Sequence, residues 1–141
     1  LMHALGNDLP NVAVISAVER PDKKIPSSIE ASEVAQRAKN GEIKGANVDG
    51  PLAFDVAVSA TAAEIKCVDS TVSGCADILL VPNIETGNAL FKQMVYFMGA
   101  TAAGIVLGAK VPILLTSRAD PPVARVASAA LASLIADKNL E

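Results

Sequence analysis

Three side chains that could act together on an anion lie close together toward the carboxyl end of the sequence. Ser117 supplies a hydroxyl group, Arg118 a guanidinium group and Asp120 a carboxylate. They follow an apolar run at residues 111–115 and precede two prolines. This order predicts a buried strand, a polar turn and the start of a helix, an arrangement in which α/β proteins often bind ligands.

A phosphate or acyl phosphate is the ligand that suits these side chains. The guanidinium of Arg118 offers two parallel N–H donors that match phosphate oxygens. Free backbone N–H groups at the start of the next helix would attract the same anion. The alternative is that Ser117 caps that helix beside a solvated Arg118. Asp120 could be a general base or the helix N-cap, and on local grounds the N-cap is favoured.

A second polar turn follows the apolar run at residues 76–81. Asn83, Gly87 and Asn88 let the backbone approach a ligand closely. Lys92 lies four residues after Asn88 and therefore on the same face of a helix. These four residues are candidates for substrate binding. An ordinary strand-to-helix connection with a solvated Lys92 is the alternative.

The composition favours an α/β domain. Of the 141 residues, 51% are hydrophobic and only 3% are aromatic, which suits parallel strands covered by alanine-rich helices. The net charge of −3 gives no electrostatic reason to bind nucleic acid or an acidic membrane surface.

The cysteines and the single histidine argue against several kinds of site. Cys67 and Cys75 lack metal-ligand spacing, and two reduced thiols are favoured over a disulfide. His3 lies at the start of the chain and offers no base to a serine or cysteine. The spacing of the cysteines predicts no metal site. Because we find neither a signal peptide nor a long apolar run, we expect a cytoplasmic enzyme without a membrane span.

The hydrophobic pattern alternates between strands and helices. Ser27 and Glu30 have capping-box spacing at the start of one helix, and Gly50-Pro51 is expected to end a strand. The residues at 1–6 resemble the end of a helix already under way, so the chain is expected to be part of something longer. Strands are predicted at residues 12–16, 46–49, 76–81 and 111–115, and residues 101–107 are either a strand or a buried glycine-containing run. Helices are predicted at 27–40, 54–61, 86–98 and from 123 to the end, a loop at 19–26, and a loop or lid at 62–74. Such alternation predicts a parallel or mixed sheet with helices on its faces.

Three strings occur in an order that resembles one enzyme family. They are DGPLAFD at residues 49–55, ADILLVPNIETGNALFK at 76–92 and TSRAD at 116–120. The chain resembles the C-terminal portion of the phosphate acetyl/butyryltransferase family. The similarity is closest to phosphate butyryltransferases and to hydratase–phosphate acetyltransferase fusions.

The resemblance implies an architecture. It is a three-layer α/β sheet with helices on both faces, similar to isocitrate and isopropylmalate dehydrogenases, with a cleft between two domains. Residues 1–108 would belong to the second, cleft-closing domain. Residues 109–141 would return to the first domain, most of which is absent from this sequence. The family typically forms homodimers.

The resemblance also implies a reaction, in which acyl-CoA and phosphate give acyl phosphate and CoA, with an acetyl or butyryl group transferred. The Ser-Arg pair of the family matches Ser117 and Arg118, which would bind phosphate and stabilise the transition state. A carboxylate must help to remove the CoA thiol proton. Acetyltransferase members have an aspartate seven residues after the serine, where this chain has Ala124, so Asp120 or another group would act. CoA is a substrate, no cofactor is implied, and we expect the 141 residues to be inactive alone.

Two other functions stay open from the residues. A metal- and NAD-dependent hydroxy-acid dehydrogenase relative would need clustered aspartate ligands, which the sequence does not display. A non-catalytic CoA- or phosphate-binding or assembly module would keep the fold and the binding groups without turnover.

Overall fold

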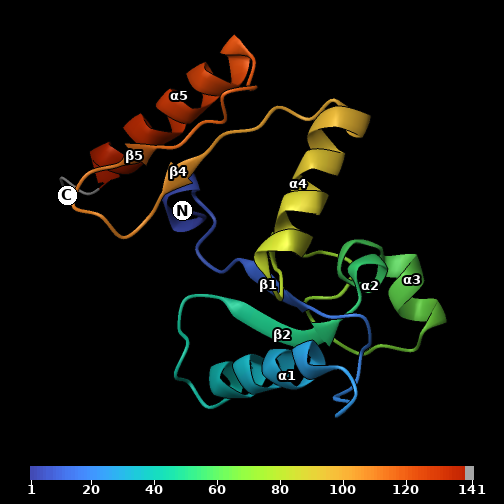
Figure 1. Cartoon of the computed structure of the whole chain (residues 1–141). Helices are drawn as coiled ribbons and strands as arrows, with labels where there is room; N and C mark the ends of the chain where they lie inside the picture. The colour runs from blue at the N-terminus through green and yellow to red at the C-terminus, as the bar shows by residue number, and fades with distance from the viewer. Residues whose placement is uncertain (139–141) are drawn as a thin grey trace. The chain divides into compact units, whose positions relative to one another are not determined.

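The computed structural model describes the backbone of residues 1–138 and the side chains of residues 1–136 (Figure 1). Contacts divide the chain into two compact units. Unit 1 comprises residues 1–7 together with the residues from 88 onward, and unit 2 comprises residues 8–87. The predicted domain boundary after residue 108 concerns the whole protein and stays a prediction.

Unit 2 is built on a parallel sheet with the strand order β2-β1-β3. The strands are β1 (Asn11–Ile15), β2 (Asn47–Leu52) and β3 (Ile78–Leu80). The central strand β1 pairs Val12 with Val48 on one side and with Ile78 on the other. The predicted strand at residues 12–16 is therefore confirmed as the buried centre of a parallel sheet.

Helices pack on both sides of β1, because side chains alternate between the two faces of a strand. Ala13 and Ile15 join a core cluster with residues of α2 (Phe54–Val58) and α3 (Ala60–Ile65). Val14 is buried on the opposite face. Helix α1 (Pro26–Lys39) packs along β1 and β2 and buries Ala31 and Ala35 (Figure 1).

Two details of unit 2 differ from the prediction. Strand β2 does not end at Gly50-Pro51 but continues to Leu52, because the two residues bulge opposite Val14 and the register shifts there. A proline is tolerated because β2 is an edge strand of the described sheet. The N-cap of α1 is Ile25 without a side-chain cap bond, so the capping box is wrong; the Ser27 hydroxyl instead bonds that of Ser16 at 3.0 Å.

The predicted helix at residues 54–61 is two helices. Ser59 is extended, with φ −130° and ψ 114°, and its hydroxyl accepts the N–H of Ala62 at 3.2 Å. Serine competes for backbone groups in this way, which makes it a helix cap rather than a helix-interior residue. Since α3 ends at Ile65, the first residues of the predicted loop at 62–74 are helical.

Unit 1 contains short strands and longer helices. A 3₁₀ turn, His3–Leu5, ends at Gly6 with φ +90°. Strands β4 (Ile105–Val106) and β5 (Ile113–Leu114) pair antiparallel, and α5 (Pro122–Lys138) packs against both. Helix α4 (Ile84–Met98) begins in unit 2 and continues in unit 1.

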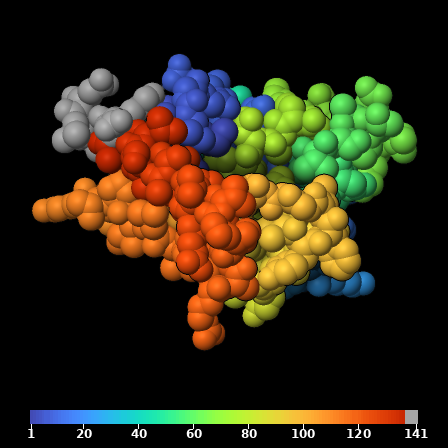
Figure 2. Space-filling model, turned by 90° about the horizontal axis from the view of Figure 1, so that it is seen from above, coloured from blue at the N-terminus to red at the C-terminus, as the bar shows by residue number. Residues whose placement is uncertain are grey.

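The strand predicted at residues 111–115 is shorter than expected and is not buried. Ile113 and Leu114 of β5 are 46% and 47% exposed. A ribbon of two very short strands with one helix against it cannot bury both of its faces. The end of α4 is also open to solvent (Figure 2), where Phe97 is 89% exposed. No helix of the described chain is long and apolar enough to cross a membrane.

A buried serine links α5 to the end of β5. The hydroxyl of Ser128 donates to the Ala124 carbonyl at 2.8 Å and accepts the N–H of Gly104 at 3.0 Å. The carbonyl of Gly104 accepts the N–H of Leu115 at 3.0 Å. A Cβ atom at Gly104 would overlap the Leu115 carbonyl oxygen, so the contact requires glycine. This Ser128–Gly104 clasp fixes the backbone immediately before residues 116–120.

A lysine joins three segments of unit 2. The Nζ atom of Lys66, after α3, lies 2.8 Å from Oε1 of Glu19 and 3.0 Å from Oδ2 of Asp55. The hydrogen bond from Lys66 lowers the pKa of Asp55. The bonds to Glu19 and then to Asp55 raise the pKa of Lys66. The bridge ties the loop after β1 to α2.

The clasp predicts that Ser128→Ala removes the hydrogen-bond acceptor of the Gly104 N–H. We expect a loss of about 1–3 kcal/mol in local stability, and hence amide exchange at Gly104 that is faster by at least about tenfold. Hydrogen-exchange NMR measures this rate. Ser133→Ala is the matched control, because the Ser133 hydroxyl also bonds a carbonyl four residues back, at 3.1 Å, but is exposed. Equal exchange at Gly104 in the two variants would contradict the clasp.

The bridge predicts that Lys66→Met raises the pKa of Asp55 toward its ordinary value. Because the folded-state pKa is lowered, the ionised carboxylate stabilises the fold above its ordinary pKa, and this contribution disappears as the pH falls through the folded-state pKa. Carboxyl-carbon NMR titration measures the change. Lys44→Met serves as the control, since Lys44 is exposed and has no described ion pair. An unchanged Asp55 titration in Lys66→Met would show that the bridge does not form.

Candidate functional site

The turn between β5 and α5 brings two of the predicted site residues together. The carboxylate of Asp120 accepts the backbone N–H of Ser117, with 2.6 Å between Oδ2 and N. The N–H of Asp120 returns to the Ser117 carbonyl at 3.1 Å, and the Ser117 hydroxyl oxygen accepts the N–H of Ala119 at 3.4 Å. The turn is therefore closed by its own side chains.

These bonds rule out the helix-cap interpretation of Ser117 and Asp120. Helix α5 begins at Pro122, and the N–H of Ala124 bonds the Pro121 carbonyl at 3.0 Å. Both polar side chains hold the turn, and within the described chain neither is bonded to an N–H of α5. The physical reason is that Pro121 and Pro122 have no N–H and the Ala124 N–H already bonds the Pro121 carbonyl, so few donors at the start of α5 remain for a side-chain cap.

Arg118 is the available cation of this turn. Its side chain is exposed, and no carboxylate of the described chain pairs with it. Ser117 is exposed as well, and neither residue lines the two hollows described below. In unit 1, taken alone, the pair therefore faces solvent.

The turn before α4 uses its asparagine as a cap. Oδ1 of Asn83 accepts the N–H of Thr86 at 2.8 Å, which satisfies a donor in the first turn of α4. A Cβ atom at Gly87 would lie 3.0 Å from Cγ2 of Val81, so glycine lets the helix start close to the end of β3. The ordinary strand-to-helix interpretation thus accounts for Asn83, and Gly87 serves helix packing.

Asn88 and Lys92 lie one turn apart on the exposed part of α4. The Nζ atom of Lys92 is 5.9 Å from the centre of the Tyr96 ring, a cation–π contact. Asn83 and Gly87 belong to unit 2, whereas the other predicted site residues belong to unit 1. Their convergence on one site stays a prediction.

A hollow of about 1010 Å³ in unit 2 was not predicted. Segments from the loop after β1, the end of β2 and the end of α3 line it. Its cations are five of the chain's 12 lysines and arginines: Arg20, Lys23, Lys24, Lys39 and Lys66. The available sequence signal is the density of basic residues directly after a strand, where the sequence pattern predicts only a loop.

A second hollow, of about 640 Å³, lies in unit 1, and most of the residues that line it are apolar. Leu1, Leu107, Val111 and Ile135 are among the residues that line it. Cys67 and Cys75 are free, exposed thiols. Among the described residues, no three His, Cys, Asp or Glu side chains are grouped so that they could hold a metal ion.

Known proteins are similar to this chain in sequence and in fold. The family model described as phosphate acetyl/butaryl transferase matches residues 1–133. A phosphate acetyltransferase of Rickettsia felis is 54% identical over 96% of this chain and 39% of its own length. A probable phosphate butyryltransferase of Bacillus subtilis is 50% identical over 92% of this chain and 44% of its own.

A solved structure agrees with these relatives. A branched-chain phosphotransacylase from Enterococcus faecalis superposes with a TM-score of 0.84 and 38% identity, covering 94% of this chain and 48% of the other. The chain thus spans less than half the length of these relatives. On the match over residues 1–133, the chain belongs to the phosphate acetyl/butyryltransferase family.

Proposed function

We propose that the protein containing this chain transfers an acetyl or butyryl group between coenzyme A and inorganic phosphate. The family match over residues 1–133 carries the proposal. The turn at residues 116–120 supplies groups that suit this reaction. The guanidinium of Arg118, which has no ion pair among the described residues, can bind phosphoryl oxygens. The Ser117 hydroxyl hydrogen can donate outward while its oxygen accepts the Ala119 N–H.

In the proposed reaction, the CoA thiolate attacks the acyl carbon of an acyl phosphate, and the bond to phosphate breaks. Negative charge develops on the carbonyl oxygen and on the leaving phosphate. Arg118 and Ser117 would stabilise this charge. Asp120 is the proposed base for the thiol proton. Its Oδ2 atom accepts the Ser117 N–H, which leaves Oδ1 to take the proton.

The remaining parts of the proposal concern the whole protein. Asn83, Gly87, Asn88 and Lys92 would contribute to substrate binding. The fold would be that of the isocitrate and isopropylmalate dehydrogenases, with residues 1–108 in the cleft-closing domain and residues 109–141 in the other. We further propose a cytoplasmic homodimer that needs no cofactor besides its CoA substrate. The 141 residues alone would be inactive, since they span less than half of the relatives' length.

Arg118→Ala tests the role of the guanidinium. In a protein extended to the length of its relatives, we expect kcat/KM for acyl phosphate formation to fall by at least about 100-fold. Release of CoA thiol measures the rate. Arg125→Ala is the control, since Arg125 is also exposed and lacks a described ion pair. Near-normal activity in Arg118→Ala would reject the site. Binding of CoA and phosphate without turnover in the unsubstituted protein would favour a binding module.

Asp120→Asn separates the two roles of Asp120. The asparagine oxygen can still accept the Ser117 N–H, so the turn should persist, whereas the proton acceptor is lost. If Asp120 is the base, we expect kcat to fall by about 100-fold or more, with the Ser117 amide still protected from hydrogen exchange. Asp120→Ala should lose both activity and protection. Unchanged kcat in Asp120→Asn would mean that Asp120 only shapes the turn.

A further inference from the structure

The hollow in unit 2 lies where parallel sheets commonly bind ligands. Because β1 and β2 are parallel, their carboxyl ends meet at one edge of the sheet. The hollow is lined there by residues 18–24, after β1, and by residues 49–52 of β2. From β1 and β2 the chain continues into α1 and α2, which pack on opposite faces of the sheet. Crevices at such positions are the usual ligand sites of open α/β sheets.

Four carboxylates, those of Glu19, Asp22, Asp49 and Asp69, line the hollow together with its five cations and neutralise them only in part. Lys66 pairs with Glu19 at 2.8 Å, and Lys39 lies 3.5 Å from Asp49. The carboxylate of Asp22 accepts the backbone N–H of Lys24 at 2.8 Å.

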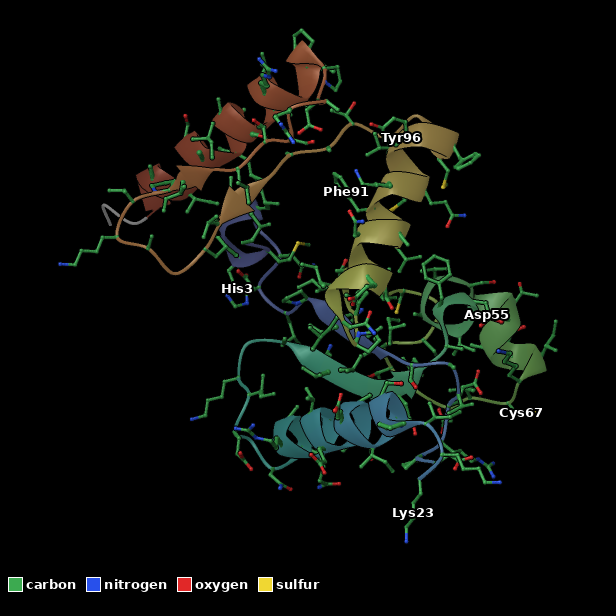
Figure 3. All side chains as sticks on the ribbon, viewed as in Figure 1. His3, Lys23, Asp55, Cys67, Phe91 and Tyr96 are labelled. Atoms are coloured by element: carbon green, nitrogen blue, oxygen red, sulfur yellow. The ribbon has the colours of Figure 1, made fainter. Side chains whose placement is uncertain are left out.

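Three lining cations, Arg20, Lys23 and Lys24, have no ion pair within the described chain. Lys23 extends from its loop into solvent (Figure 3). The three are therefore free to pair with an anion from outside the chain.

We propose that this hollow binds the phosphate groups at the nucleotide end of coenzyme A. The inference rests on the proposed function for the identity of the ligand. Three unpaired cations within five residues suit a ligand with several phosphate charges. The volume of about 1010 Å³ is at the upper end of the roughly 300–1,000 Å³ typical of pockets for drug-sized molecules. A nucleotide therefore suits the hollow better than inorganic phosphate, which would fill a small part of it.

The position of Lys66 gives the hollow a defined wall. By holding Glu19 and Asp55, Lys66 fixes the loop that carries Arg20 at the side of α2. It also occupies the Glu19 carboxylate, which would otherwise repel phosphate beside Arg20. The ion pairs of Lys66 thus fix the wall of the hollow. Arg20, Lys23 and Lys24 supply the positive charge that would attract phosphate.

Calorimetry with 3′-phosphoadenosine 5′-phosphate tests the site on the 141-residue chain itself. This probe carries nucleotide phosphates but no thiol, so binding does not depend on turnover. We expect binding that weakens with added salt. The triple variant Arg20→Ala/Lys23→Ala/Lys24→Ala should bind at least about tenfold more weakly. The triple variant Lys44→Ala/Arg125→Ala/Lys110→Ala removes the same charge elsewhere and should bind as the unsubstituted chain does.

Two further ligands identify the source of the phosphate. Adenosine should bind much more weakly than the probe, and inorganic phosphate should not compete at equal concentration. In the extended protein, the Arg20/Lys23/Lys24 variant should raise KM for CoA with kcat nearly unchanged, and should raise KM for dephospho-CoA less. If the extended protein does not turn over acyl-CoA and phosphate, the proposed function is rejected. The calorimetry on the 141-residue chain still shows whether the hollow binds the nucleotide phosphates. No probe binding, equal weakening in both triple variants, or equal competition by inorganic phosphate would each overturn the inference.

Discussion

Parallel pairing along β1 is the constraint on which the described sites of unit 2 depend. It aligns β2 and β3 with the same direction on either side of one buried strand. The segments that follow the three strands therefore emerge at a common edge, although they are far apart in the sequence. The basic loop after β1 and the turn at Asn83 both owe their positions to this pairing.

The polar side chains of two turns, at Asn83 and at residues 116–120, form hydrogen bonds that stabilise the turns themselves. Asn83 caps α4, and Asp120 closes the turn that Ser117 begins. Such bonds fix the backbone without consuming every donor or acceptor of these side chains. Arg118 differs, because it adds nothing to the turn by hydrogen bonding within the described chain. A residue that the local fold does not need is the stronger candidate for binding a ligand.

The sequence predicted most reliably those elements whose hydrophobic pattern is completed by nearby residues. Strand β1 and helix α1 are examples, because their partners are within unit 2. The pattern at residues 111–115 instead predicted a buried strand, and Ile113 and Leu114 are exposed. An apolar run in a sequence predicts burial, but it does not identify the segment that packs against it. The break at Ser59 was missed because alanine and valine on both sides continue a helical pattern.

Candidate site residues were harder to predict than the fold, for a similar reason. Ser117, Arg118 and Asp120 could be proposed as a site because they lie within four residues of one another in the sequence. The hollow of unit 2 was missed because Lys39 and Lys66 join Arg20, Lys23 and Lys24 only through the fold. The Ser128–Gly104 clasp was invisible for the same reason, since its residues are 24 positions apart.

The two prolines at the start of α5 limit how many backbone N–H donors could bind a phosphoryl group at the turn of residues 116–120. They leave this helix poor in amide hydrogens where a rigid anion cradle would need them. In the proposed reaction, the attraction would then rest mainly on the guanidinium of Arg118, at the end of a long side chain with several rotatable bonds. Such a donor would be able to follow a phosphoryl oxygen as the bond to the acyl carbon lengthens, whereas a rigid set of backbone N–H groups would favour a single position of that oxygen.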